Sequence, residues 1–249
     1  MKKNITKLFL LLGLLGVSGF ALSRAFFSDT EKSEGNVLSA GSLNLQISAT
    51  TSKNGETAPS WDFTDLTNQK FFNFSSLMPG DYGVSTIGVK VFDTDAYACA
   101  TIDNMIDDDV SCTTPEAIDE ANPTCGGQGP ATGELSSQIH FFAWDDSNND
   151  GVWDSGESHL FSNIEGPASD ILDGKTYPLN VPSTSALVHD QPRYISLYWC
   201  YGALTVDQNA NTLTCDGSLV DNKSQTDSLT ADISFNIEQA DNNDDFSCN

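Results

Sequence analysis

The residues best suited to chemistry lie in one segment, Asp-Ser-Asn-Asn-Asp-Gly-Val-Trp-Asp-Ser-Gly-Glu, which runs from Asp146 to Glu157. A calcium-binding loop of this length presents oxygen ligands at positions 1, 3, 5, 7, 9 and 12 and turns at a glycine in position 6. Gly151 stands at that turn, where a side chain would be disfavoured. The ligand positions hold carboxylates, one amide and one backbone carbonyl: Asp146, Asn148, Asp150, Val152, Asp154 and Glu157.

This pattern predicts one bound Ca²⁺ ion with a structural role, because the ion would neutralise the carboxylates and fix the loop. Residues 138–144, which precede the loop, alternate as a strand does, so we expect the loop without the flanking helices of an EF-hand. Such loops in extracellular modules bind calcium weakly, with a Kd of roughly 10⁻⁴–10⁻³ M. The alternative is an ordinary turn in a chain already rich in aspartate.

Catalytic motifs are not found in the sequence. The three histidines, His140, His159 and His189, form neither an H-E-x-x-H motif nor a pair with i, i+4 spacing. No G-x-S-x-G nucleophile motif is present. Two carboxylates could meet in a cleft, as in glycosidases, but sequence spacing does not reveal such a pair. We therefore predict no catalytic residues and no enzymatic activity.

The N-terminal residues have the three parts of a secretory signal peptide. Three lysines within residues 1–7 precede an apolar run at residues 8–22, and small residues flank Arg24 before the expected cleavage between Ala25 and Phe26. The alternative is an uncleaved anchor, but a membrane span needs roughly 20 apolar residues. We expect a signal peptide over residues 1–25, contact with the membrane only during export, and a signal peptidase as a transient partner.

Acidic residues dominate the charge. The net charge is −24, and loss of the signal peptide would remove four of the 11 basic residues, giving about −28. Such a field repels phosphate backbones and excludes nucleic acid as a partner, whereas it attracts divalent cations.

Six cysteines remain in the exported part, and an even number in such a chain indicates disulfides. The short spacings favour Cys112–Cys125 and Cys200–Cys215 as local loop closures, which leaves Cys99 for Cys248. The sequence by itself does not decide among the possible pairings.

Apolar and polar residues alternate in five separate stretches, which predicts half-buried antiparallel strands. These stretches lie at residues 43–48, 86–91, 139–143, 195–201 and 229–238. With Gly, Pro, Asn and Asp in the connections, we predict an all-β, jelly-roll-like β-sandwich that forms a single domain over residues 26–249. Residues 107–133 are expected as a long loop, and the acidic runs at 107–109 and 244–245 as solvated loop faces.

Several motifs resemble the TasA/camelysin family, whose members are exported through a SipW-type signal peptidase. They are Phe26-Phe27-Ser28-Asp29, Ala40 to Leu45, Leu77 to Asp81, Asp95-Ala96-Tyr97 and Gln225 to Leu229. The resemblance is strongest over residues 1–100. It implies a jelly roll and a secreted subunit of a cell-surface fibre or biofilm matrix, in which the N-terminal segment of one subunit completes a sheet of the next. Metalloprotease activity described for camelysin-like members does not carry over, because the histidine motif is missing.

Residues 26–39 could serve as that donor strand, since 14 extended residues span about 46–50 Å. Phe26 and Phe27 offer large apolar side chains, and the candidate donor residues are Phe26, Phe27, Val37 and Leu38. The chain is then expected to form homo-oligomeric fibres. The alternative functions are a monomeric surface module that binds polysaccharide through Trp61 or Trp153, and, less favoured, a secreted hydrolase.

Overall fold

The computed structural model describes residues 43–58, 60–162, 164–180, 185–243 and 245–248. All of them belong to one unit, Gly41–Asn249. The expected signal peptide, the cleavage site at Ala25 and Phe26, and the expected donor segment with Phe27, Val37 and Leu38 lie outside the described residues. Within the described ranges, no helix combines the length and the apolar character needed to cross a membrane.

The larger sheet is antiparallel and contains seven strands in the order β2-β1-β4-β10-β7-β8, with β3 paired to β1. Its strands are β1 (Asn44–Lys53), β2 (Glu56–Thr57), β3 (Trp61–Thr64), β4 (Tyr82–Phe92), β7 (Ile139–Asp145), β8 (Gly166–Pro167) and β10 (Arg193–Tyr201). Four of the five alternating stretches found in the sequence form β1, β4, β7 and β10, so these strand predictions are confirmed.

The smaller sheet has the order β13-β5-β6, with β9 also paired to β5. Its strands are β5 (Ala96–Asp109), β6 (Gly129–Pro130), β9 (Lys175–Pro178) and β13 (Ser228–Gln239), the last of which is the fifth predicted stretch. A separate hairpin is formed by β11 (Ala203–Asp207) and β12 (Thr212–Asp216). The described residues also form three short helices: α2 (Thr114–Asp119), α3 (Leu135–Gln138) and α4 (Ala168–Ile171).

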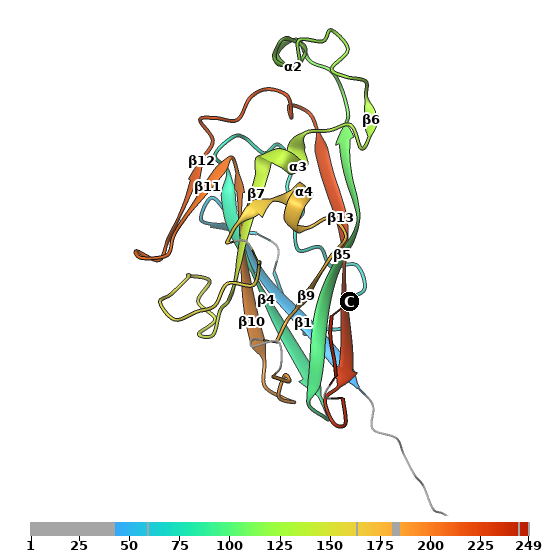
Figure 1. The fold of residues 1–249 in the computed structure, drawn as a ribbon, viewed down its shortest axis with the longest axis vertical. Helices are drawn as coiled ribbons and strands as arrows, with labels where there is room; N and C mark the ends of the chain where they lie inside the picture. The colour runs from blue at the N-terminus through green and yellow to red at the C-terminus, as the bar shows by residue number, and fades with distance from the viewer. Residues whose placement is uncertain (1–42, 59, 163, 181–184, 244, 249) are drawn as a thin grey trace, which may run out of the picture. The chain divides into compact units, whose positions relative to one another are not determined.

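The two sheets face each other (Figure 1), and apolar side chains of both sheets pack together between them. Val89 and Val91 of β4 and Ile195 of β10 contact the same cluster as Ala98 of β5 and Phe235 of β13. Near α3 and α4 a second cluster joins β7 and β10 to those helices. The all-β sandwich predicted from the sequence is confirmed, and the jelly-roll connectivity stays a prediction.

The central strands β7 and β10 are covered on both faces. Phe142 and Trp144 point away from the sandwich core, yet both are 0 % exposed. They form a third apolar cluster with Trp153, Tyr198 and the β11–β12 hairpin residue Leu204. The outer face of the sheet is therefore also a packed surface, which explains why nearly every residue of β7 is buried.

The expectation of one long loop over residues 107–133 is wrong. The β5 strand extends to Asp109, and α2 follows with Thr113 as its N-cap and Glu116 closing a capping box. Nor is the acidic run at 107–109 a solvated face, because Asp107 is 8 % exposed and Asp109 is 1 % exposed. The strand was missed because its second half, Asp103 to Asp109, is mostly polar and hides the alternation.

Two turns at the start of the larger sheet are linked by a buried carboxylate. Asn54 and Gly55 both have positive φ in the β1–β2 hairpin, as a two-residue Asn-Gly turn requires. Asp81 ends the Pro79-Gly80 turn and is 6 % exposed. It accepts hydrogen bonds from Asn54 Nδ2 at 2.7 Å and from the Met78 N–H at 3.0 Å, and Lys53 Nζ lies 3.1 Å from Oδ2.

Three disulfides are formed: Cys99–Cys248, Cys112–Cys125 and Cys200–Cys215. These are the pairs that the spacing of the cysteines favours. Cys112–Cys125 closes the segment that carries α2, which we call the α2 lobe (residues 112–125). Cys200–Cys215 fastens β12 to the larger sheet, and Cys99–Cys248 joins the C-terminal segment to β5.

The disulfides should differ in their effect on stability. Cys99–Cys248 closes a loop of 149 residues and Cys112–Cys125 one of 13. Chain-entropy arguments give about 5 and about 3 kcal/mol for loops of these lengths. We expect urea unfolding to show a larger loss for the C99A/C248A variant than for C112A/C125A. Equal losses would mean that the loop length does not determine the effect.

The Asp81 contacts should make stability depend on pH. Burial opposes ionisation of Asp81, but the hydrogen bonds from Asn54 and Met78 and the nearby Lys53 charge outweigh it and lower the pKa of Asp81 below 3.8. The ionised group therefore stabilises the fold above the unfolded-state pKa, and this stability is lost as pH falls through the folded-state pKa. We expect Asp81→Asn to cost about 1–2 kcal/mol at pH 7 in urea unfolding, and less at pH 3.

Asp62→Asn is the matched control for this experiment, because Asp62 is an exposed carboxylate on the neighbouring strand β3. A loss of stability in Asp81→Asn that does not shrink on acidification would contradict the ionic origin of the effect.

Candidate functional site

The predicted calcium loop directly follows β7 and returns to pair with it. The Asp145 N–H donates to the Ser158 carbonyl at 2.9 Å, and Trp144 and His159 form an isolated antiparallel bridge. The prediction that a strand precedes the loop is confirmed. Gly151 has φ +69°, and a Cβ there would lie 3.3 Å from Thr86 Oγ1, so both the backbone conformation and the close approach to β4 favour glycine.

The first predicted ligand, Asp146, is fixed inside the loop. Its side chain is 0 % exposed and accepts hydrogen bonds from the backbone N–H groups of Asp150 at 3.1 Å and Gly151 at 2.9 Å. Ser196 of β10 donates its hydroxyl to Asp146 Oδ2, the oxygen that also accepts from Gly151, at 2.7 Å. These bonds hold the loop in its curved form and attach it to the larger sheet.

The remaining predicted ligands surround the curved backbone. Asn148 Nδ2 donates to Asp150 Oδ2 at 2.9 Å and to Asp154 Oδ2 at 3.1 Å, so the amide lies between two carboxylate oxygens that a cation could bridge. Glu157 at position 12 accepts from the N–H groups of Ser147 and Asp154, each at 2.9 Å.

An aromatic side chain of the loop packs against β7. Trp153 is 7 % exposed, and its ring centroid lies 4.8 Å from that of Phe142 in an edge-on contact. Val152, whose carbonyl is the predicted ligand at position 7, is 55 % exposed. The sequence placed Trp153 among the possible sugar-binding aromatics, and the structure shows instead a buried anchor.

Burial disfavours the ionised form of two acids at the ends of the loop. It raises the pKa of Glu157, although backbone hydrogen bonds from Asp154 and Ser147 oppose the shift. Burial also raises the pKa of Asp145, and the Arg193 guanidinium at 2.7 Å acts in the opposite direction. In both side chains the largest effect is the cost of removing a charged carboxylate from water.

The loop has the donor set that calcium prefers, since every side-chain ligand offers oxygen and the ligands come from one short curved segment. Its acids do not, in the described conformation, bring three carboxylate oxygens within 4.8 Å of one another. Closure around an ion would require the Asn148 amide to turn its oxygen inward. Calcium at this loop stays a prediction.

A second group of acids was missed by the sequence analysis. Asp109, Glu116 and Asp227 are the only three among the described residues whose ligand atoms all lie within 4.8 Å of one another. Burial together with the Asp107 and Asp109 charges raises the pKa of Asp227 to about 6. Burial and the Asp227 charge raise the pKa of the neighbouring Glu134 to about 7. Spacings as different as seven and 111 residues left no motif in the sequence that could have revealed the group.

The histidines have separate partners. His140 Nδ1 lies 2.8 Å from Glu165 Oε2, His159 Nδ1 lies 2.7 Å from the Phe161 carbonyl, and His189 Nδ1 lies 2.7 Å from Asp95 Oδ1. His140 is half-buried on β7, as the strand pattern suggests.

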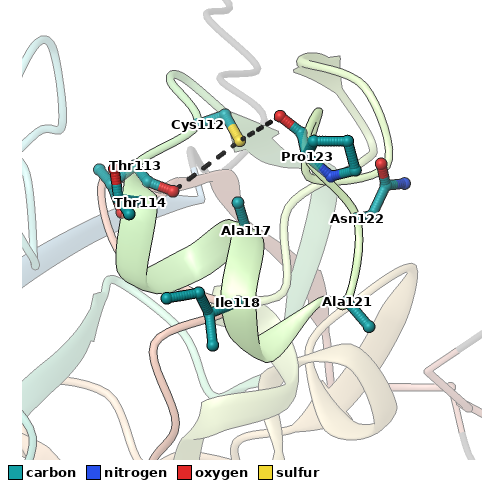
Figure 2. A pocket seen from close by; sticks show the side chains of 8 residues that line it. All are labelled: Cys112, Thr113, Thr114, Ala117, Ile118, Ala121, Asn122 and Pro123. Atoms are coloured by element: carbon teal, nitrogen blue, oxygen red, sulfur yellow. Dashed lines mark hydrogen bonds between the residues drawn. The ribbon is translucent and has the colours of Figure 1, made fainter.

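A hollow on the α2 lobe is lined by small or uncharged side chains (Figure 2). Figure 2 shows Cys112 at one side of it and Ile118, which is 71 % exposed, on the helix. Since Cys112 is in a disulfide, the lining residues offer no free thiol, carboxylate or basic side chain.

No protein-family model matches the chain, and no curated protein matches it either. The resemblance to the TasA/camelysin family therefore stands on the motifs in the sequence alone.

We expect Glu157→Gln to weaken calcium binding at the loop at least about tenfold, because it removes one charge and the bidentate ligand at position 12. The measurement is a calcium titration followed through the NMR amide signals of residues 146–157. Glu56→Gln is the control, since Glu56 is an exposed acid on β2. Equal affinity in both variants, or loop signals that calcium does not move, would refute the site.

Proposed function

We propose that this chain is an extracellular structural subunit of a surface fibre or biofilm matrix and that its copies assemble by strand donation. The single observation that carries the proposal is the edge of the smaller sheet. The β13 strand is 12 residues long and pairs with β5 on one side, and no other described strand pairs with it. Such an edge presents a row of backbone donors and acceptors to a further strand.

The geometry of β13 suits the addition of a strand. Pairing with β5 is regular from Asp232 to Gln239, and no lysine or proline, which commonly protect sheet edges, occurs in the strand. Its core-facing residues Ile233, Phe235 and Ile237 are only partly buried. An added strand would cover their remaining apolar surface and satisfy the outward backbone groups.

The proposed donor matches this edge in length. Residues 26–39, extended, span about 46–50 Å, whereas the 12 residues of β13 span about 40 Å. Phe26 and Phe27 would supply apolar side chains for the exposed flank of the sandwich. The donor in this proposal is a second copy of the chain.

Secretion is supported by the disulfides, because such bonds persist in oxidising compartments. The net charge, −24 for the whole chain and about −28 without the signal peptide, keeps unassembled copies soluble and excludes nucleic acid as a partner. The polysaccharide-binding alternative has no support from its two candidate aromatics. Trp153 is buried, and Trp61 packs against Phe71 with ring centroids 5.2 Å apart.

Deletion of Phe26 to Asp29 from the chain that starts at Phe26 should abolish filaments in negative-stain microscopy and sedimentation, because the donor loses its apolar anchor. Far-UV circular dichroism should show an unchanged fold. Filaments that persist in the deletion variant would refute strand donation.

The acceptor edge is tested separately by the S234K/N236K variant, which places two lysines on exposed positions of β13. We expect shorter or absent filaments, since edge lysines disfavour strand addition. The matched control, T212K/T214K, puts the same charges on exposed positions of β12. Equal filament yield from the two variants would exclude β13 as the acceptor.

A further inference from the structure

The acidic side chains Asp109, Glu116 and Asp227, which we call the carboxylate cluster, come from three separate segments. Asp109 is the last residue of β5, Glu116 lies in α2, and Asp227 immediately precedes β13. Figure 1 shows the adjoining upper ends of β5 and β13 with α2 above them. Asp109 is 1 % exposed and Glu116 is 0 % exposed, whereas Asp227 is partly buried, so the cluster reaches from the interior toward the surface.

The unpaired atoms of this cluster are the second, independent observation. Both carboxylate oxygens of Asp109, Oε1 of Glu116 and Oδ1 of Asp227 are buried and have no hydrogen-bond partner. None of the ion pairs within the described part of the chain involves these residues. An uncompensated buried carboxylate costs several kcal/mol, and either protonation or a bound cation removes this cost at the four unpaired acceptors.

Backbone groups hold the carboxylates in this orientation. Glu116 Oε2 accepts from the Thr113 N–H at 3.1 Å within the capping box, which leaves Oε1 free. Asp227 Oδ2 accepts from the Glu134 N–H at 2.7 Å, which leaves Oδ1 free. One oxygen of each side chain is thus used to position it, and the other remains available to a ligand.

We propose that the carboxylate cluster binds one Ca²⁺ ion, separate from the predicted ion of the loop at residues 146–157. Calcium–oxygen bonds of about 2.3–2.6 Å allow ligand oxygens up to about 5 Å apart. The mutual limit of 4.8 Å in the cluster fits this requirement. The donors are all oxygen, the set that hard cations prefer over zinc or copper.

Asp107, two residues before Asp109 on β5, offers a further oxygen near the cluster, although it is not one of the three side chains within 4.8 Å of one another. Its Oδ2 accepts from the Ser136 N–H at 2.7 Å, and its Oδ1 is buried without a partner. Calcium takes six to eight oxygens, and water would complete the shell. Magnesium demands a smaller octahedral shell and retains most of its water, so a cluster of several buried carboxylates suits calcium better.

The ion would fasten the α2 lobe to the sandwich. Polar contacts join the lobe to the segment before β13: Thr113 Oγ1 to Gln225 Oε1 at 2.6 Å and the Asn222 N–H to Asp119 Oδ2 at 2.8 Å. A third contact, from Thr226 Oγ1 to the carbonyl of Ser111 at 2.6 Å, lies directly before the lobe. Carboxylate repulsion opposes these contacts. A divalent cation converts that repulsion into a bridge between α2, β5 and β13.

The first experiment counts calcium ions on the disulfide-bonded chain that starts at Phe26, by equilibrium dialysis and isothermal titration calorimetry. The native chain should bind one more ion than D109N/D227N, and a D154N/E157Q loop variant should retain the cluster ion. Asp108→Asn is the matched control, since it changes a neighbouring acid of β5 outside the cluster and should leave the stoichiometry unchanged.

The second experiment takes its main measurement in a variant whose cluster is unchanged, so that this result does not depend on how the cluster variants fold. In the D154N/E157Q variant, hydrogen exchange of the amides at residues 113–120 should slow about 100-fold when calcium exceeds its Kd 100-fold. In D109N/D227N, calcium should have no effect on these amides. Magnesium at the same concentration should have little effect.

The proposal is overturned if D154N/E157Q binds no calcium or if D109N/D227N binds as many ions as the native chain. It is also overturned if calcium does not change hydrogen exchange in the α2 lobe. Preferential binding of zinc would overturn the assignment to calcium. These outcomes are independent of filament formation, so the site and the proposed function can fail separately.

Discussion

The cost of removing a carboxylate from water is the constraint on which the rest of this structure depends. A chain with 35 acidic residues and 11 basic ones cannot compensate every buried acid with a lysine or arginine. Basic side chains do so at Asp81, where Lys53 together with Asn54 joins two turns at the start of the larger sheet. They also do so at the partly buried Asp145, which pairs with Arg193. At Asp146 the compensation comes from backbone N–H groups and Ser196, and this arrangement shapes the predicted calcium loop.

The carboxylate cluster completes this series, because its buried oxygens have neither a basic side chain nor enough N–H donors. In the proposed picture two cations, one at the loop and one at the cluster, supply the charge that the sequence lacks. Both sites lie at the margins of the sandwich, and the disulfides fasten other marginal segments: the α2 lobe, β12 and the C-terminal segment. Such bracing suits a protein that works outside the cell, where calcium is abundant and thiols are oxidised. The β13 edge, by contrast, is left open in the described structure and gives the proposed assembly its point of attachment.

Strands with clear alternation were predictable because a sheet with one face on the core imposes that pattern. The alternation is visible within a few residues, as at Leu45 and Ile47 in β1 or at Ile233 and Phe235 in β13. The pairing of Cys112 with Cys125 also followed from short spacing. The strand β5 could not be predicted over its full length. Its polar half contains Asp107 and Asp109, whose burial depends on groups far along the chain. Helix α2 was missed because six residues are too few to show a helical period.

The sequence by itself determined the class of fold, the candidate calcium loop and the disulfide-forming cysteines, because each of these depends on residue types at short spacings. The tertiary structure decided which acids are buried together. Asp109, Glu116 and Asp227 become neighbours only when β13 pairs with β5 and the α2 lobe folds over their ends. Contacts of this kind are set by the register of strands that are distant along the chain, and residue spacing carries no record of that register.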